Sequence, residues 1–428
     1  MQNVAESPRT IATRAVHDVV VRGRSLDRAL DASPQGKDRA LVTELAFGTV
    51  RHYYSLSSEI RARLRMPLKP QEAIVECALL VGAYQLRHLR VPPYAAVSES
   101  VRTVVELGRP WAKGLTNAVL RRIAREPPIV ENEEAMLDQP RWIIDALRAD
   151  RLHDADEILR VSNERAPMSL RVNRLVQPRD EYRAALESVG IASQPGFTAE
   201  SLRLDAPCAT TTLPGFASGA VSVQDEGAQL AAGLLPLAPR ARILDACAAP
   251  GGKAFHLLEC EPSLQLVALD VEHARCDDIR AGAARLGVEP TVICGDATGR
   301  AWWDDVVFDA VLVDAPCSGT GTLRRHPDIR LLKHARDVPA FANLQHDLLQ
   351  NLWGTLRAGG TLLYCTCSIL SAENDAVIGR FLGLQSDAES LAIDATWGTA
   401  TTHGRQLFPA SGGPDGFYYA RLRKRSYR

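Results

Sequence analysis

The sequence has no run of apolar residues that approaches the roughly 20 needed to cross a membrane. Its first residues, MQNVAESPRTIATRAVHDVV, lack the uninterrupted apolar stretch of a signal peptide. The nine cysteines are odd in number and scattered through the chain. Together these absences predict a cytoplasmic protein with reduced thiols and no membrane contact.

Motifs for common metal and phosphate ligands are also missing. One CxC pair, Cys365 and Cys367, occurs without a second CxC or CxxC and without an obvious histidine partner, so we expect no bound metal. The glycine-rich turn at Gly251 and Gly252 is neither GxGxxG nor the phosphate-binding GxxxxGK[ST] loop. No internal repeat or low-complexity segment is visible.

The net charge of −1 conceals an asymmetry between two parts of the chain. Residues 1–125 hold 20 Lys and Arg against 11 Asp and Glu, whereas the remainder holds 30 against 40. A basic segment joined to an acidic one suggests that the first part meets a polyanion, although an Arg-rich solvated surface explains the same counts. The candidate contacts are Arg61, Arg63, Arg65, Arg121, Arg122, Arg324 and Arg325.

Hydrophobic periodicity and proline placement divide the 428 residues into three predicted domains. Residues 1–126 read as a helical bundle, with helices at 38–56 and 71–89 and breaks at Ser33–Pro34, Met66–Pro67 and Val91–Pro93. A polar linker with three prolines covers 126–140. A small α/β adaptor is expected over 141–235, with a helical start at 142–159, strands at 169–172 and 202–204, and a helix at 179–189.

Residues 236–428 form the third predicted domain, in which short apolar runs alternate with helical stretches. The runs are 243–247, 266–269, 291–294, 310–313 and 361–364, with helices at 273–286 and 338–356 and a late strand at 416–422. This alternation indicates an α/β fold, a parallel sheet with helices on both faces.

Ligands of such sheets bind beyond the carboxyl ends of the strands, so the residues that follow each run are informative. The runs are followed in turn by Cys247-Ala248-Ala249-Pro250-Gly251-Gly252-Lys253, Asp270, Asp296, Asp314-Ala-Pro-Cys317, and Thr366-Cys367-Ser368. Asp270 lies 19 residues beyond Gly251, near the offset at which an acidic residue meets ribose hydroxyls. This pattern suits a nucleoside cofactor without a pyrophosphate. S-adenosylmethionine fits, with Asp270 at the ribose and Asp296 at the adenine amino group.

Two thiols indicate the class of reaction. Cys317 and Cys367 lie in polar turns at the expected crevice, whereas Cys77, Cys208, Cys260, Cys276 and Cys294 read as small buried apolar residues. A thiolate that attacks carbon 6 of cytosine makes carbon 5 able to take a methyl group, which is covalent catalysis. The spacing does not decide which of the two thiols attacks.

Several segments resemble the RNA cytosine-C5 methyltransferases of the RsmB/NOP2 family. They are DACAAPGGK (245–253), DAPCSGTGTLRRHPDIR (314–330) and YCTCS (364–368), with further similarity at 38–52, 84–101 and 117–125 to the NusB-like helical domain of one branch. The resemblance implies a Rossmann-like methyltransferase domain with a mostly parallel seven-stranded sheet. It also implies 16S rRNA as partner and S-adenosylmethionine as cofactor. We expect a monomer.

The same resemblance implies roles for individual residues. Cys367 corresponds to the nucleophile and Cys317 to the cysteine that assists product release. The stretch Cys247–Lys253, with Asp270, Asp296 and Asp314, corresponds to the cofactor site; Asp314 also holds the cytosine edge, and Lys253 lies near the reacting centre. Other readings are the same chemistry on tRNA, DNA or another rRNA position, or a ribosome-assembly or antitermination factor that binds without turnover.

Overall fold

The computed structural model describes residues 6–31, 38–150 and 153–426. The chain forms two compact units. The helical unit comprises Met1–Glu164 and Leu323–Ala335, and the sheet unit comprises Arg165–Thr322 and Arg336–Arg428. Among the described residues, no helix combines the length and the apolar character that a membrane crossing requires.

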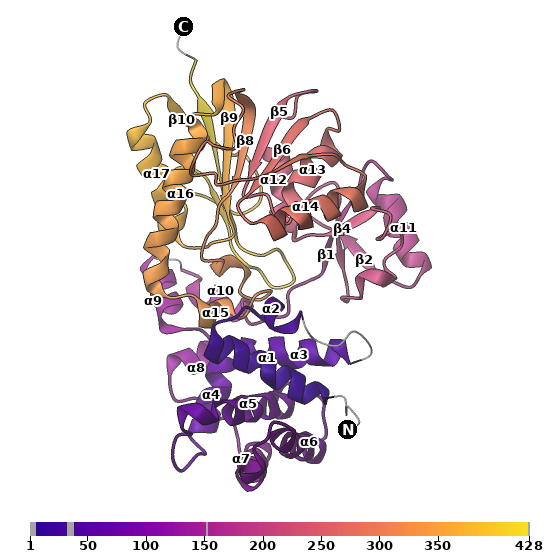
Figure 1. Cartoon of the computed structure of the whole chain (residues 1–428), viewed down its shortest axis with the longest axis vertical. Coiled ribbons are helices and arrows are strands. Elements are labelled where there is room, and N and C mark those ends of the chain that lie inside the picture. Colours follow the sequence, from indigo (N-terminus) through magenta and orange to yellow (C-terminus); the bar gives the residue numbers. More distant parts are fainter. Residues whose placement is uncertain (1–5, 32–37, 151–152, 427–428) are drawn as a thin grey trace. The chain divides into compact units, whose positions relative to one another are not determined.

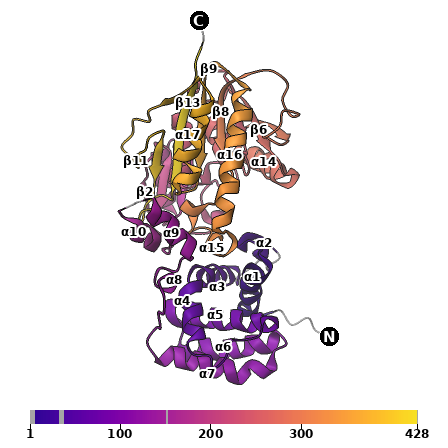
Figure 2. The same cartoon turned by 90° about the vertical axis from the view of Figure 1, so that its left-hand side faces the viewer.

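The helical unit is a bundle around one apolar core (Figure 2). Its helices are α1 (Pro8–Arg22), α2 (Leu26–Leu30), α3 (Arg39–Arg51), α4 (Tyr53–Arg61), α5 (Ala73–His88), α6 (Pro93–Glu106), α7 (Lys113–Arg125), α8 (Glu133–Leu137), α9 (Arg141–Ala149), α10 (Ala155–Val161) and α15 (Ile329–Leu332). Helix α5 is buried along most of its length, and α1, α3, α4, α6 and α7 pack against it.

The predicted helices of this part are present with altered ends. The helix expected at 38–56 is two helices, α3 and α4, because the backbone of His52 leaves helical geometry between them. The expected linker contains the short helix α8, whose first turn is capped by the Asn132 side chain accepting from Ala135 N–H. The helical start at 142–159 is likewise two helices, α9 and α10. The break expected at Ser33–Pro34 lies outside the described residues.

Residues 323–335 belong to the helical unit although they follow the fourth predicted strand along the chain. The Asp328 carboxylate accepts from Leu26 N–H at 3.1 Å. Arg330 is buried and donates to the carbonyls of Ser162 and Arg51. The motif at 314–330 therefore has two structural roles, because its second half is part of the helical core.

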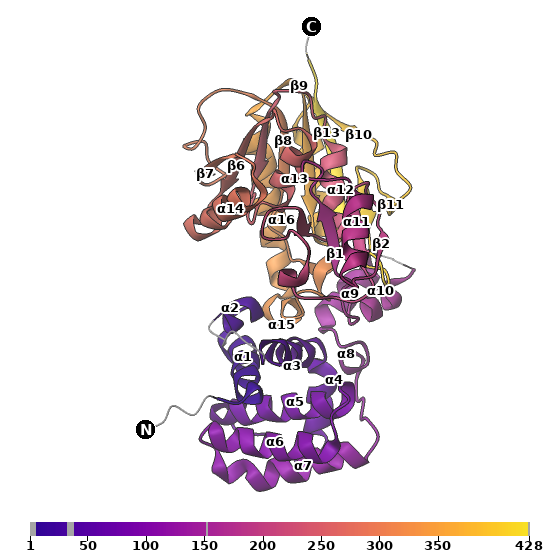
Figure 3. The same ribbon diagram turned by 90° about the vertical axis from the view of Figure 1, so that its right-hand side faces the viewer.

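The sheet unit contains a small antiparallel sheet in the order β2-β3-β1-β4, flanked by α11 (Figure 3). These elements are β1 (Ser169–Val172), α11 (Arg179–Ser188), β2 (Ser193–Pro195), β3 (Ser201–Leu204) and β4 (Val221–Val223). Arg171 in β1 is fully buried and forms a bidentate ion pair with Glu259. Its Nη2 donates to Glu259 Oε1 at 2.7 Å and its Nε donates to Oε2 at 2.9 Å. The same guanidinium donates to the Gly252 carbonyl at 2.6 Å, so the small sheet is fixed to the glycine-rich turn.

The large sheet has nine strands in the order β11-β12-β13-β9-β8-β5-β6-β7, with β10 paired to β13. The strands are β5 (Arg242–Ala246), β6 (Gln265–Asp270), β7 (Thr291–Cys294), β8 (Phe308–Asp314), β9 (Leu356–Thr366), β10 (Ala388–Leu391), β11 (Thr399–Ala400), β12 (Arg405–Leu407) and β13 (Phe417–Lys424). Strands β5 to β9 are parallel and confirm the predicted α/β fold, and the pairings of β10 to β13 are antiparallel. The resemblance implied seven strands and the sheet has nine; the short strands β10, β11 and β12 lack a clear apolar run and were not expected from the sequence.

Helices cover both faces of the large sheet (Figure 1). The helices are α12 (Glu226–Leu234), α13 (Gly252–Cys260), α14 (His273–Leu286), α16 (Val338–Trp353) and α17 (Asp375–Leu384). Helices α12, α13 and α14 share one apolar core with residues such as Ile243 and Leu312, and α16 and α17 share the other with Leu244 and Val313. Successive strand residues thus face opposite cores, as expected for strands buried on both sides.

Candidate active site

The predicted site residues lie at the carboxyl ends of the parallel strands. Asp270 ends β6 and Asp314 ends β8, while Cys367 directly follows β9. Strands β8 and β9 are paired in parallel with Asp314 opposite Cys365. This register confirms that the strands preceding the two thiols are neighbours.

The two thiols are in contact. Cys317 Sγ lies 3.5 Å from Cys367 Sγ, and either sulfur can donate the hydrogen bond. The hydrogen bond with Cys367, burial, and the charges of Cys367 and Glu373 raise the pKa of the Cys317 thiol well above its usual value. The contact with Cys367 and burial therefore disfavour a negative charge on Cys317.

A partly buried ion pair lies beside the thiols. Lys253 Nζ donates to Asp314 Oδ2 at 2.6 Å, and Cys365 Sγ lies 3.4 Å from the other oxygen of Asp314. Burial alone would lower the pKa of Lys253, but the charges of Asp314, Cys365 and Cys367 raise it. Lys253 is thus held protonated. Asp314 is about one-third exposed, so its carboxylate remains reachable from the crevice.

Two glycines, Gly251 and Gly321, allow backbone geometry near this site that other residues would not. Gly251 has φ +100°, and a Cβ there would lie 2.1 Å from the Phe255 ring, so the turn before α13 requires glycine. Gly321 donates to the Cys367 carbonyl and its own carbonyl accepts from Gly416 N–H. A Cβ on Gly321 would lie 2.3 Å from the Gly416 carbonyl oxygen. The loop that carries Cys317 is therefore seated directly against the turn that carries Cys367.

A separate pocket of about 150 Å³ brings together Cys247, Asp270 and Asp296. Pro316 also lines it, so the pocket borders the segment that carries Cys317. Asp270 accepts from the backbone N–H groups of Ala249 and Glu272, which fixes its carboxylate against the glycine-rich turn. Burial and the neighbouring aspartates raise the pKa of Cys247 to about 12, so this thiol is uncharged.

The remaining predicted cofactor residues form the turn next to this pocket. Ala248 accepts from Gly251 N–H at 2.7 Å, and Ala249 and Pro250 lie between them. Gly252 begins α13, whose second residue is Lys253. The turn thus connects the acidic pocket to the lysine beside the thiols.

Sequence patterns did not identify two buried carboxylates near the site. Asp245, in β5, is fully buried, and burial with the charge of Asp314 raises its pKa. Glu373, in the 3-10 turn Ser371–Glu373, is fully buried behind the thiols. A polar residue within the apolar run of β5 was a usable signal for Asp245, whereas nothing local distinguishes Glu373.

Other predicted residues lie apart from this site. Cys77 and Cys276 are buried as expected, while Cys208, Cys260 and Cys294 are half-buried. Two arginines offered as RNA contacts, Arg63 and Arg324, are buried, which corrects that expectation for them. Arg63 pairs with Glu59 and Glu126, whereas Arg61, Arg65, Arg121 and Arg122 are exposed and Arg325 is half-buried.

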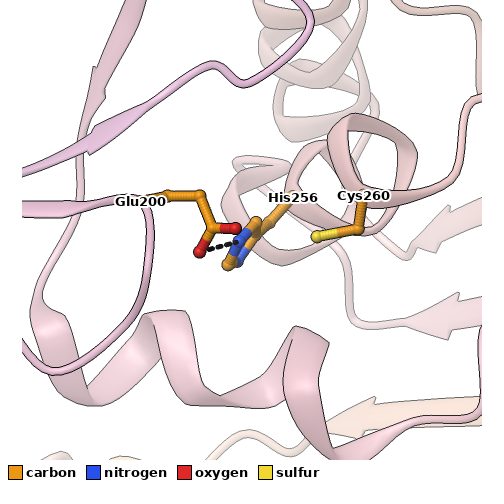
Figure 4. Close-up of side chains that lie close together, drawn as sticks. All are labelled: Glu200, His256 and Cys260. Atoms are coloured by element: carbon orange, nitrogen blue, oxygen red, sulfur yellow. Dashed lines mark ion pairs between the residues drawn. The ribbon is translucent and has the colours of Figure 1, made fainter. Parts of the chain in front are cut away.

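A second cluster of potential ligand atoms lies away from the thiols (Figure 4). Glu200, His256 and Cys260 bring one oxygen, one nitrogen and one sulfur within 4.8 Å of one another. Arg174 lies 3.4 Å from the Glu200 carboxylate and also hydrogen bonds to Cys260. The Arg174 guanidinium therefore already offsets the negative charge of Glu200 in this cluster.

This strand order, with a glycine-rich turn after β5 and an acidic pocket at the carboxyl ends of β5 to β7, defines a Rossmann-like methyltransferase domain. Residues 232–423 match the model of the 16S rRNA methyltransferase RsmB/F family. Residues 6–125 match the NusB family, and residues 139–211 match the ferredoxin-like domain of RsmF/B-like methyltransferases.

Individual relatives cover nearly the whole chain. The chain is 45% identical to ribosomal RNA small subunit methyltransferase B of Pseudomonas syringae pv. tomato, over 98% of this chain and 97% of that protein. It is 44% identical to the protein of the same name from Xanthomonas campestris pv. campestris, over 98% and 97% of the two chains. A methyltransferase homologue from Pyrococcus horikoshii has a solved structure that is 28% identical, with a TM-score of 0.58 over 68% of this chain and all of its own. The chain belongs to the RsmB/F family of 16S rRNA methyltransferases.

Proposed function

We propose that this chain methylates carbon 5 of a cytosine in 16S rRNA through a covalent bond between Cys367 and carbon 6, with Cys317 assisting product release. The observation that carries the proposal is the contact between the two sulfurs beside the Lys253–Asp314 ion pair. Membership of an rRNA methyltransferase family supports the substrate class.

The chemistry requires one thiol to attack and a base to act later. Attack of the Cys367 thiolate on carbon 6 forms a carbon–sulfur bond and moves the ring electrons toward carbon 5, which then takes the methyl group. S-adenosylmethionine, when bound, supplies that methyl group from its sulfonium. Removal of the carbon 5 proton returns an electron pair to the ring, and the carbon 6–sulfur bond breaks to release Cys367 as a thiolate.

The environments of the thiols support this division of labour. The contact with Cys367 and burial raise the pKa of Cys317 and disfavour its thiolate, which supports Cys367 as the nucleophile. Once Cys367 is bonded to carbon 6, its negative charge is gone, and one cause of the raised pKa of Cys317 disappears. Cys317 then releases its own proton to solvent more readily, and the resulting thiolate accepts the proton from carbon 5.

Asp314 and Lys253 orient the cytosine ring in this scheme. The reachable carboxylate of Asp314 accepts from the amino edge of cytosine, and Lys253 fixes that carboxylate by the 2.6 Å hydrogen bond. The protonated lysine also offsets negative charge that develops in the site during attack.

The acidic pocket fits a cationic nucleoside cofactor. Asp270 would hold the ribose hydroxyls, Asp296 would accept from the adenine amino group, and the backbone of 247–252 would allow close approach. The buried carboxyl of Asp245 lies within electrostatic reach of Asp270 and Asp314. A positively charged ligand would offset the accumulation of carboxylates there.

The helical unit supplies an exposed basic surface for RNA. Tyr94, Arg121 and Arg125 line a groove of about 550 Å³ between α6 and α7. Tyr94 is 80% exposed, and such a ring can stack on an unpaired base while arginines contact phosphates. We propose this groove as one RNA contact.

Separate serine variants of the two thiols test the proposal. Cys367→Ser should abolish both methyl transfer and the covalent adduct with RNA, whereas Cys317→Ser should accumulate an adduct that survives a denaturing gel. The measurement is transfer of labelled methyl groups from S-adenosylmethionine to undermethylated 16S rRNA, with mapping of the modified base. Cys208→Ser, outside the site, is the matched control and should behave as the wild type.

The outcomes also separate the alternatives. Reversed behaviour of the two variants would overturn the assignment of roles. Preferential methylation of tRNA, DNA or another rRNA position would replace the substrate. RNA binding without methyl transfer by the wild type, under conditions where S-adenosylmethionine binds, would favour an assembly or antitermination factor.

A further inference from the structure

One buried carboxylate contacts both thiol-bearing turns. Glu373 is fully buried, and its Oε1 accepts from Ser318 N–H at 2.8 Å. Its Oε2 accepts from Ser318 Oγ at 2.5 Å and from Ser368 Oγ at 2.7 Å. Ser318 directly follows Cys317 and Ser368 directly follows Cys367, so a single side chain holds the residues adjacent to both sulfurs.

All contacts of this carboxylate come from donors. Gln345 Nε2 donates to Oε1 at 3.2 Å and also to the Pro316 carbonyl at 2.8 Å. With the backbone N–H and the two hydroxyls, four donors therefore converge on two oxygens. An ionised carboxylate accepts about four hydrogen bonds, so this arrangement fits a glutamate and conflicts with an amide that must donate.

The surrounding hydroxyls extend the same connection. Thr320 Oγ1 lies 3.1 Å from Ser368 Oγ and accepts from Ile369 N–H. Ser318 Oγ lies 3.3 Å from Ser368 Oγ. These residues are buried, so the network is shielded from water and its geometry is strongly determined.

We propose that Glu373 is a positioning residue that fixes the Cys317 turn against the Cys367 turn and selects Cys367 as the nucleophile by disfavouring negative charge on Cys317. This inference rests on the proposed two-thiol reaction. Its electrostatic part agrees with the contribution of the Glu373 charge to the raised pKa of Cys317. Removing that charge should lower the pKa of Cys317, and disturbing the turns should slow proton removal from carbon 5.

Glu373→Gln tests both parts, with Glu226→Gln as the matched control. Glu226 is also fully buried in the sheet unit, but its carboxylate accepts from Phe197 N–H and Ser169 Oγ, away from the thiol network. On undermethylated 16S rRNA with S-adenosylmethionine, Glu373→Gln should form the adduct but release it roughly 10–100-fold more slowly, as expected when a catalytic group is misplaced. Glu226→Gln should release it at the wild-type rate.

A second measurement does not depend on turnover. In a Cys367→Ser background, the rate of alkylation of Cys317 by iodoacetamide is followed against pH. Adding Glu373→Gln should shift the profile toward lower pH, whereas Glu226→Gln should leave it in place. If Glu373→Gln does not fold, Ser318→Ala and Ser368→Ala each remove one donor to the carboxylate and should slow release without removing the charge.

The two measurements distinguish the possible failures. Wild-type release together with an unchanged alkylation profile in Glu373→Gln would overturn the inference. Absence of an adduct in both the wild type and Cys317→Ser would instead overturn the proposed function. The alkylation profile alone would then still decide whether Glu373 controls the charge of Cys317.

Discussion

Replacing Arg171 should destabilise the sheet unit more than any exposed arginine does. Its guanidinium is fully buried, and its two bonds to Glu259, itself 1% exposed, balance a charge that water cannot reach. Arg171→Met leaves that carboxylate unpaired, which costs about 3–5 kcal/mol for a broken buried pair. For a unit of this size, about 2–4 °C per kcal/mol gives a decrease of roughly 6–20 °C in Tm.

The contact of Arg171 with the Gly252 carbonyl adds a functional consequence. Loss of this bond should loosen the turn next to the acidic pocket and weaken binding of S-adenosylmethionine. Calorimetric unfolding and titration with the cofactor measure the two effects on the same preparation. Arg171→Lys should be intermediate, since an ammonium lacks the planar fork that matches a carboxylate.

Two control variants test whether the stability loss comes from the buried ion pair. Arg280→Met removes an exposed pair with Asp277 and should cost no more than about 1 kcal/mol. The double variant Arg171→Met, Glu259→Met should recover most of the lost stability, because apolar side chains of similar size often replace a buried ion pair without loss. A Tm of Arg171→Met within about 1 °C of the wild type would correspond to a loss of less than about 1 kcal/mol. That result would refute the cost assigned to breaking the buried ion pair.

Four further outcomes are expected. Diamide should oxidise Cys317 and Cys367 to a disulfide and block adduct formation until dithiothreitol is added, whereas Cys367→Ser should show no such cross-link on a peptide map. Gly321→Ala should impair methyl transfer more than cofactor binding in a side-by-side assay, because its Cβ would meet the Gly416 carbonyl. Asp296→Ala should raise the Kd for S-adenosylmethionine in calorimetry while leaving Tm nearly unchanged. Burial and two neighbouring arginines lower the pKa of His256 in the folded chain. Below about pH 6.5 the unfolded chain therefore binds a proton at this histidine that the folded chain does not bind. The stability of the fold should decrease from about pH 7 to about pH 5, and His256→Gln should reduce that decrease in thermal melts.

Local patterns in the sequence predicted the parallel strands and several of the helices. Apolar runs predicted β5 to β9, as expected where both faces of strands such as β5 and β8 are buried, and the helix 273–286 coincides with α14. The short strands β10 to β12 were not predicted, because they lie at an edge where few side chains are buried. The division of 38–56 into two helices was likewise not visible, since it depends on the packing of the bundle rather than on a proline.

The sequence by itself also determined which residues gather at the carboxyl edge of the sheet, because parallel strands must all end there. It could not determine how those residues pair, since hydrogen bonds form across long separations in the chain. Only the tertiary structure brought the sulfurs of Cys317 and Cys367 to 3.5 Å, placed Glu373 behind both, and assigned Arg324 and Arg330 to a buried core. The physical reason is that burial and partner choice depend on packing between distant segments, and no local pattern encodes them.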